Sequence, residues 1–254
     1  MALPTSLPPS MIVRLDDHDV SSFSRVAAAF GTDRFGFVIT PNVDHLIRYC
    51  DDESFRELYS GADYVLLDSR FLSRLLFMTK RLRMRVCPGS DLTAELFQKV
   101  IAPTDGVVLV GGSDEQAQWL TQRYGLKDLR HYNPPMGFIR DPNALEACLQ
   151  FIEAQSPFRF CFLAVGCPQQ EMIAQALKTR GRAKGLALCI GASINFLTGE
   201  ERRAPLWAQR FGIEWLFRLA YSPSRLANRY LVRGPRIFML LPQMRFDFGP
   251  RNLA

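Results

Sequence analysis

The stretch "GVVLVGGSDEQAQWLTQRYG", residues 106–125, joins an apolar run to a polar helical pattern through a pair of glycines. A continuous apolar run is typical of a strand that is buried on both faces, as the strands of a parallel sheet are. The helical part begins at Asp114, a residue suited to a helix start, and ends at Gly125, a residue suited to a helix stop. This stretch therefore predicts a buried strand followed by a crossover helix.

The same alternation extends over residues 36–191. Continuous apolar strands separated by crossover helices predict an α/β fold, with a parallel sheet covered by helices on both faces. Ligands of such sheets bind beyond the carboxyl ends of the strands. The expected strands are 36–40, 62–67, 106–112, 129–133, 158–166 and 185–192, and the helices between the later ones are 91–101, 114–125, 141–154 and 168–181.

The pattern changes after Ala192. Residues 205–221 have helical periodicity, with Trp207, Phe211 and Trp215 four residues apart on one face. Pro223 and Pro235 interrupt the segment that follows, and no strand is expected in it. The sequence thus predicts two domains, an α/β core at 1–197 and a helical appendage at 198–254.

The positive charge belongs to this appendage. The chain of 254 residues has a formal net charge of +6, but residues 202–254 contain ten arginines, no lysine and only two acidic residues. That segment carries +8 and the rest of the chain −2. Any anionic partner is therefore expected to meet the appendage.

Several other features limit the class of protein. The six cysteines form no CxxC pair and several lie in apolar runs, which indicates buried reduced thiols. The first residues lack the pattern of a secretion signal, and no uncharged apolar run approaches the roughly 20 residues of a spanning helix. We expect a cytosolic protein, at most peripheral to a membrane.

Small or polar residues follow nearly every expected strand. Glycines allow a ligand to approach the backbone, and the free N–H groups of a following helix attract phosphate. A nucleotide diphosphate is therefore a reasonable ligand. The residues concerned are Thr40, Asn42, Asp68, Gly111, Gly112, Gly137 and the turns "GCPQQE" (166–171) and "GASINF" (191–196).

Each of these signals also has a simpler interpretation. Gly111 and Gly112 suit a tight turn, and Asp68 suits the N-cap of a helix. Gln170 and Glu171 suit the first turn of an exposed helix. His45 and His131 are isolated and lack metal-ligand spacing. The "DHD" at 17–19 precedes the α/β pattern, and GxGxxG, Walker A and nucleophile-elbow motifs are absent from the sequence.

As an ordered set, the motifs are more specific than any one of them. The sequence resembles the WecG/TagA/CpsF family of glycosyltransferases, family 26, over roughly residues 11–235. The motifs that carry the resemblance are "TPNVDHL" (40–46), "ADYVLLD" (62–68), "RMRVCPGSDL" (83–92), "LVGGSDE" (109–115), "GF" (137–138), "GCPQQE" (166–171), "IGASINFLTGEERRAPLW" (190–207) and "EWLFRLAYSPSRLANRY" (214–230).

The resemblance implies an inverting transfer of a sugar from a UDP-sugar to a saccharide on a polyprenyl diphosphate. It also implies a Rossmann-like core (1–197) that binds the UDP-sugar, a helical appendage (198–254) for the lipid-linked acceptor, a metal-independent reaction without a cofactor, and a place on the inner face of the cytoplasmic membrane. The products would be exopolysaccharide or another cell-surface polymer. The donor sugar, UDP-glucose or UDP-N-acetylmannosamine in type, stays open, as does a homo-oligomeric state.

The resemblance also assigns roles to residues. Asp68 matches the general base, although Ser69 replaces the glycine that usually follows it. Arg85 matches an arginine near the active site, and Gln170 matches the glutamine of "PKQE", whose lysine is Gln169 here. We expect substrate contacts from Thr40, Asn42, Gly111, Gly112, Gly137, Phe138, Gln170, Gly191 and Ala192, and contacts with the acceptor diphosphate or the membrane from Arg203, Arg218, Arg225 and Arg229.

One alternative belongs to another class. Alternating arginines and aromatic residues in the appendage also permit stacking on single-stranded nucleic acid. Recognition motifs of nucleic-acid-binding modules are absent from the sequence, and the −2 charge of residues 1–201 opposes such a partner. We therefore expect no nucleic acid among the partners.

Overall fold

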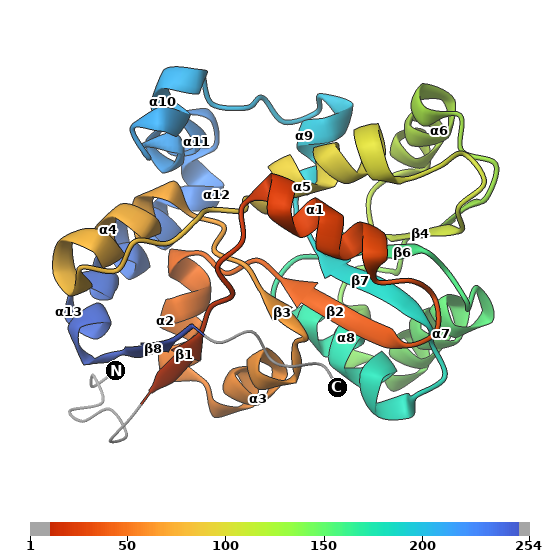
Figure 1. The fold of residues 1–254 in the computed structure, drawn as a ribbon, viewed down its shortest axis with the longest axis horizontal. Helices are drawn as coiled ribbons and strands as arrows, with labels where there is room; N and C mark the ends of the chain where they lie inside the picture. Colours follow the sequence, from red (N-terminus) through yellow and green to blue (C-terminus); the bar gives the residue numbers. More distant parts are fainter. Residues whose placement is uncertain (1–10, 249–254) are drawn as a thin grey trace.

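The computed structural model describes residues 11–248, apart from the side chain of Arg225. Its centre is a sheet of six parallel strands in the order β3-β2-β7-β6-β4-β5 (Figure 1). The strands are β2 (Phe35–Ile39), β3 (Tyr64–Val65), β4 (Val107–Val110), β5 (Leu129–Tyr132), β6 (Phe160–Leu163) and β7 (Gly185–Cys189). All six predicted strands are thus present; β2 has the predicted length but is shifted by one residue, and the other five are shorter than their apolar runs.

Helices cover both faces of the sheet, as the sequence predicts. Along β2 the side chains alternate, so that Val38 packs with Phe23 of α1 while Phe37 and Ile39 pack with Leu46 of α2. One face carries α1 (Val20–Ala29), α5 (Gly89–Glu95), the π-helical η1 (Leu96–Val100) and α6 (Asp114–Tyr124). The other carries α2 (Val43–Asp51), α3 (Glu53–Gly61), α7 (Pro142–Ala154) and α8 (Gln169–Arg180).

Three further helices follow strand ends or turns. They are α4 (Arg70–Lys80), the short η2 (Phe138–Arg140) and α9 (Ser193–Thr198). Helix α9 ends at Gly199, whose φ of +84° is left-handed, at the expected border of the appendage. The division into two domains at this border stays a prediction.

The appendage is helical but broken into short pieces. The expected continuous helix over 205–221 is wrong, because Gly212 has a φ of +65° and separates α10 from α11. Trp207 and Phe211 therefore do not share a packed face with Trp215, and they are 58% and 65% exposed. The pieces are α10 (Leu206–Arg210), α11 (Glu214–Tyr221), α12 (Pro223–Ala227), η3 (Asn228–Arg233), η4 (Gly234–Arg236), α13 (Ile237–Leu240) and η5 (Leu241–Gln243).

A last strand corrects the expectation that the appendage contains none. Strand β8 (Arg245–Asp247) pairs in parallel with β1 (Ile12–Arg14). The backbone N–H of Arg245 donates to the Met11 carbonyl at 2.8 Å. The segment "RFD" has no apolar run that would indicate a strand, and the backbone of β1, 233 residues earlier, supplies the pairing instead.

Side chains of the appendage also enter the main core. Ile237, Leu241 and Met244 are buried in the same cluster as Leu46 and Leu76. Helix α13 packs against α2, and Phe238 meets Phe71 of α4 edge to face at 6.4 Å between ring centroids. Among residues 11–248, no helix has the length and apolar character needed to cross a bilayer.

Candidate active site

A cavity of about 430 Å³ lies at the carboxyl ends of β2, β6 and β7, where the sequence predicts ligand binding. We call it the polar cavity. Of the expected substrate-binding residues it contains Thr40, Asn42, Gln170, Gly191 and Ala192, together with Arg203 from the start of the appendage. These residues come from separate strand ends, and the parallel sheet brings them together.

A second cavity of about 360 Å³, the apolar cavity, lies between α2, α4 and the appendage. Its wall is mostly aliphatic and aromatic, and Trp215 and Tyr230 lie in it with 6.0 Å between their ring centroids. Its apolar lining residues include Val43, Phe71, Trp215, Tyr230, Leu231, Ile237 and Phe238. The appendage thus supplies most of an apolar wall beside the polar cavity.

The two cavities share six lining residues, all of them polar or charged. Asp68 is one of them, so its carboxylate lies where the cavities meet. The other five are Asn42 and Asp44 at the start of α2, Glu214 and Arg218 of α11, and Arg229 of η3. A group bound in one cavity would therefore approach a group bound in the other at Asp68.

The surroundings of Asp68 argue against a capping role. Ser69 caps α4, because its hydroxyl accepts from the Leu72 backbone N–H at 3.2 Å. Asp68 Oδ1 instead accepts from the backbone N–H of Gly89 at 2.7 Å. A Cβ at position 89 would lie 3.0 Å from Thr40 Oγ1, so glycine permits this close approach. Ser69, which replaces the usual glycine, thus serves as the N-cap of α4, and the Asp68 carboxylate faces the cavities instead of capping the helix.

Burial raises the pKa of Asp68 above its ordinary value. The Gly89 N–H and the positive charges of His45 and Arg218 counteract this rise in part, whereas Glu214 adds to it. A carboxylate that is only partly solvated and has a raised pKa is a better proton acceptor than an ordinary aspartate.

Gln170 and Glu171 are buried, contrary to their interpretation as first-turn residues of an exposed helix. They are 3% and 1% exposed. Gln170 Oε1 accepts from the Gly191 backbone N–H at 2.8 Å, and its Nε2 donates to Glu171 Oε1 at 2.8 Å. Gln170 therefore holds the turn after β7 to the start of α8.

The positive charge of the appendage is partly balanced by acidic residues of the core. Arg229 donates to Asn42 Oδ1 at 3.1 Å and lies 3.9 Å from Asp44. Arg236 forms two 2.7 Å hydrogen bonds with Asp51. The acidic residues of α2 complement these arginines, although they lie far away in the sequence.

Two arginines of the appendage line the cavities and also contact acidic residues. Arg218 lies 3.7 Å from Glu201 and stacks over Phe196 at 5.2 Å, and it lines both cavities. Arg203 donates to Ser90 Oγ at 2.8 Å and pairs with Asp91. The expected contact at Arg225 lies outside the described side chains, since only its backbone in α12 is described.

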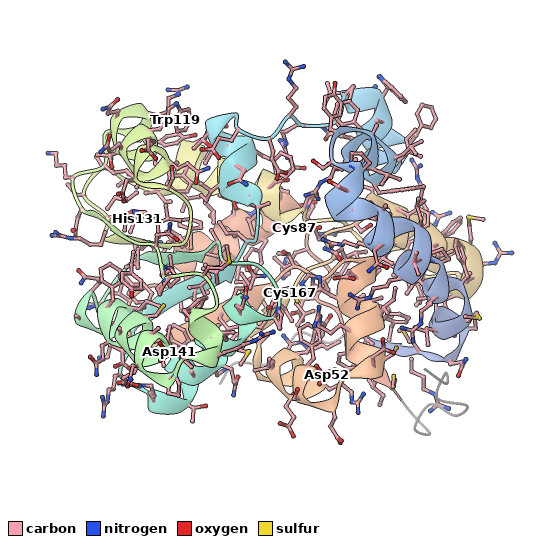
Figure 2. All side chains as sticks on the ribbon, turned by 180° about the vertical axis from the view of Figure 1, so that it is seen from behind. Asp52, Cys87, Trp119, His131, Asp141 and Cys167 are labelled. Atoms are coloured by element: carbon pink, nitrogen blue, oxygen red, sulfur yellow. The ribbon has the colours of Figure 1, made fainter. Side chains whose placement is uncertain are left out.

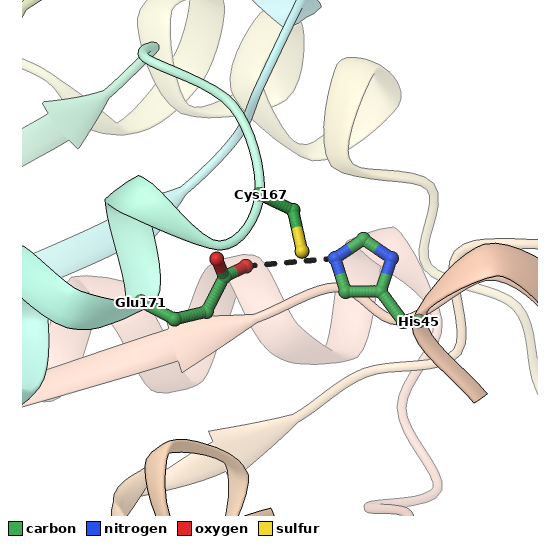
Figure 3. A group of neighbouring side chains, drawn as sticks. All are labelled: His45, Cys167 and Glu171. Carbon is green, nitrogen blue, oxygen red and sulfur yellow. Dashed lines mark ion pairs between the residues drawn. The ribbon is translucent and has the colours of Figure 1, made fainter. Parts of the chain in front are cut away.

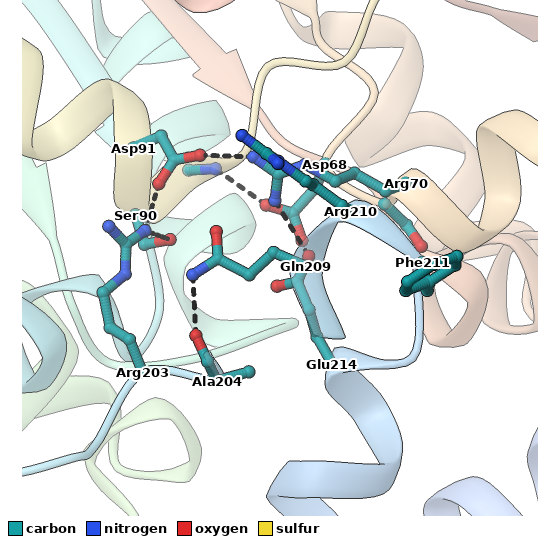
Figure 4. Close-up of polar contacts among 12 residues, drawn as sticks. Asp68, Arg70, Ser90, Asp91, Arg203, Ala204, Gln209, Arg210, Phe211 and Glu214 are labelled. Atoms are coloured by element: carbon teal, nitrogen blue, oxygen red, sulfur yellow. Dashed lines mark hydrogen bonds and ion pairs between the residues drawn. The ribbon is translucent and has the colours of Figure 1, made fainter. Parts of the chain in front are cut away.

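An ion-pair network joins the core to the appendage beside Asp68 (Figure 4). Arg70, the first residue of α4, bonds to Asp91 of α5 at 2.9 Å and to Glu214 of α11 at 2.8 Å. Asp91 also accepts from Arg203. These contacts fix the start of α11, and with it Glu214, against the core.

Five predicted site residues lie outside both cavities. Arg85 is 57% exposed, lies 3.7 Å from Asp17 and lines neither cavity. Gly111 and Gly112 follow β4, which β6 and β7 separate from β2, and the φ of +88° at Gly111 serves its turn. Gly137 begins η2, and Phe138 is buried in the core. The "DHD" is also structural, since Asp19 caps α1.

One cluster escaped the sequence analysis. His45 of α2, Cys167 of the turn after β6 and Glu171 of α8 lie together (Figure 3; Cys167 is also labelled in Figure 2), and the first two line the polar cavity. Cys167 and Glu171 are close in the sequence, in "GCPQQE" (166–171), but no spacing connects them to His45. His45 is thus not isolated, and Cys167 is the one cysteine of the six that is not buried.

The charge state of His45 reflects these neighbours. Burial lowers the pKa of His45, but the Cys167 sulfur and the Glu171 carboxylate oppose burial and raise the pKa to about 10. These two neighbours therefore favour the protonated imidazole over the neutral one.

The fold and the paired cavities define an α/β enzyme whose site lies at the carboxyl edge of a parallel sheet and extends under a helical appendage. Comparison with protein families specifies it further. The model of the glycosyl transferase WecG/TagA/CpsF family matches residues 11–249, nearly the whole chain. The chain belongs to this family, and it is a glycosyltransferase of cell-surface polymer biosynthesis.

Proposed function

We propose that the protein transfers a sugar, with inversion, from a UDP-sugar in the polar cavity to a saccharide on a polyprenyl diphosphate in the apolar cavity. The observation that carries this proposal is the position of Asp68. Asp44, Asp68 and Glu214 are the acidic residues that line both cavities. Glu214 is hydrogen-bonded to Arg70, and Asp44 lies 3.9 Å from Arg229 and 3.6 Å from Arg233, whereas the Asp68 carboxylate accepts from the Gly89 backbone N–H. A transferase with two substrates needs such a meeting point.

The donor fits the polar cavity. Its walls offer hydroxyl and amide groups for a sugar at Thr40, Asn42 and Gln170, and arginines for a diphosphate at Arg203, Arg218 and Arg229. When the bond to the anomeric carbon breaks, the negative charge of the leaving UDP increases. Fixed guanidinium groups stabilise this charge without the reorganisation that water would need.

The acceptor fits the apolar cavity. Its saccharide would lie at the shared residues, its diphosphate near Arg218 or Arg229, and the first apolar units of its lipid against Phe71, Trp215 and Tyr230. Asp68 would take the proton of the attacking hydroxyl on the face opposite the leaving UDP, which gives inversion in one displacement. General-base catalysis of this kind is typically worth about 10²–10⁴-fold in rate.

The same geometry supports a peripheral membrane position. Most of the large exposed apolar side chains belong to the appendage, and Phe77 and Met78 of α4 lie beside it. Those of the appendage are Leu206, Trp207, Phe211, Leu216, Tyr221, Leu231, Val232, Phe238, Met239 and Phe248. A lipid-linked acceptor would then enter the apolar cavity from the bilayer, and its carrier would not have to leave the membrane.

The variant Asp68→Asn tests the role of the base. Asparagine keeps an oxygen that can accept the hydrogen bond from the Gly89 N–H, but its amide cannot take a proton from the attacking hydroxyl. We expect transfer to fall by about 10²–10⁴-fold, while calorimetry should show UDP-sugar affinity within about threefold of the parent. The matched control is Asp17→Asn, which changes an aspartate outside both cavities and should leave turnover unchanged.

Stability separates loss of chemistry from loss of fold. Because burial raises the pKa of Asp68, the folded protein holds this proton more tightly than the unfolded chain does. The ionised carboxylate therefore costs stability above the ordinary pKa, and the neutral asparagine should give a melting temperature equal to or above that of the parent. Near-normal turnover in Asp68→Asn would remove Asp68 from the role of base.

A further inference from the structure

The cluster of His45, Cys167 and Glu171 has the composition of a transition-metal site. It offers an imidazole nitrogen, a thiol sulfur and a carboxylate oxygen, and these atoms all lie within 4.8 Å of one another. Thiolate and imidazole ligands suit zinc, whereas magnesium and calcium prefer oxygen ligands alone. The donor set therefore favours a borderline-soft divalent cation.

The separation of the donor atoms fits an ion better than it fits a hydrogen bond. His45 Nε2 lies 3.5 Å from Glu171 Oε1, which is longer than the roughly 2.7–3.2 Å of an ordinary hydrogen bond. Ligand bonds of about 2.0–2.3 Å in a tetrahedron place neighbouring ligand atoms about 3.4 Å apart. The observed separation is close to that value.

Unpaired polar atoms in the cluster point the same way. His45 is 7% exposed and Glu171 is 1% exposed. Among the described residues, neither ring nitrogen of His45 forms a hydrogen bond, although Nε2 lies in a 3.5 Å ion pair with Glu171 Oε1, and Glu171 Oε2 forms no hydrogen bond either. Buried polar atoms without partners are costly, and an ion between these side chains would satisfy His45 Nε2 and the carboxylate together.

The surroundings orient one of the three ligands, Glu171. Gln170 Nε2 donates to Glu171 Oε1 at 2.8 Å, and the Gly191 N–H in turn holds Gln170. Such outer contacts fix the direction of a ligating carboxylate. The three ligands come from α2, the turn after β6 and α8, so that an ion would tie these elements together.

We propose that His45 Nε2, Cys167 Sγ and the Glu171 carboxylate bind a zinc ion, with the fourth position open to the polar cavity. His45 and Cys167 line that cavity and Glu171 lies behind them, so the free position faces the space that water or another oxygen ligand can enter. The proposal does not rest on the transfer reaction, because the site can be tested without any sugar.

Cobalt(II) is the probe of choice, since a thiolate bound to cobalt gives a charge-transfer band in the near ultraviolet. The full-length protein is treated with chelator, freed of it and titrated with Co²⁺. We expect one equivalent to bind with the charge-transfer band, and one equivalent of Zn²⁺ to remove that band by displacement.

Three variants identify the ligands. Cys167→Ser should abolish the band and weaken Zn²⁺ binding by roughly 10- to 100-fold or more. Glu171→Gln, which preserves shape, should keep the band and weaken binding. Cys50→Ser changes another cysteine on the same helix as His45 and should leave the band intact; circular dichroism checks each fold. A parent protein without the band, a band that survives in Cys167→Ser, or a band lost in folded Cys50→Ser would overturn the proposal.

Discussion

At the scale of single residues, Asp68 shows what can be predicted from the sequence and what cannot. The motif "LLDSR" places an aspartate at a strand end, where a cap and a base are both reasonable. Only the structure separates the two roles, because Ser69 makes the cap and Asp68 meets Gly89 and two cavities. Ser69, which departs from the family pattern, therefore serves only as the N-cap of α4.

The raised pKa of Asp68 predicts a pH dependence. As base, Asp68 must be ionised, so the rate should fall as the pH falls through its pKa. Because burial raises this pKa, the acid limb of kcat/KM should lie above the ordinary aspartate value of 3.8. The profile is measured with saturating acceptor in overlapping buffers.

The same profile in Asp17→Asn serves as the control and should keep the limb in place. An acid limb at or below the ordinary value of an aspartate would contradict a buried base at position 68.

Residues that lie far apart in the sequence were the hardest to predict. Thr40, Asn42 and Gln170 reach one cavity because parallel strands end at the same edge, a rule that the sequence can use. His45 also meets Cys167 and Glu171 beside this cavity, but the sequence carries no spacing that connects His45 to the "GCPQQE" motif of the other two. Gly111 and Gly137 look like ligand turns in the sequence, yet the strand order places them outside both cavities.

At the scale of elements, the strands were predictable and the appendage was not. Strands β2, β4, β6 and β7 are buried apolar runs, so composition alone identifies them. In the appendage, helical periodicity continues across Gly212, but the left-handed backbone there ends the helix. Trp207 and Phe211 consequently lie exposed on the surface instead of packing under it.

This exposure predicts that the appendage docks on lipid. Trp207→Ser together with Phe211→Ser should reduce binding to anionic phospholipid vesicles by about tenfold or more, since burying roughly 100 Å² of apolar surface is worth about 2.5 kcal/mol. Sedimentation with vesicles measures this binding.

Met136→Ser removes an even more exposed apolar side chain outside the appendage and is the control. If the double variant and this control bound vesicles alike, the exposed aromatic residues would have no part in docking. Deletion of the appendage is a poorer test, because β8 pairs with β1 and Leu241 is buried in the core.

At the scale of the whole molecule, the sheet and the appendage together create the site. The sheet collects polar groups along one edge, and the appendage closes over them and adds an apolar cavity. The ion pairs of Arg70 with Asp91 and Glu214 hold the appendage against the core. The α/β class was predictable from alternation of strands and helices, whereas the junction of the cavities depends on long-range packing that periodicity does not encode.

The most direct test of this arrangement is the transfer reaction of the full-length protein. A panel of UDP-sugars is incubated with a polyprenyl-diphosphate-linked monosaccharide in vesicles, and the anomeric configuration of the product is determined by NMR. We predict that one donor gives a lipid-linked disaccharide whose new glycosidic bond is inverted relative to that donor. Transfer with retained configuration, or no transfer from any UDP-sugar in the panel, would contradict it.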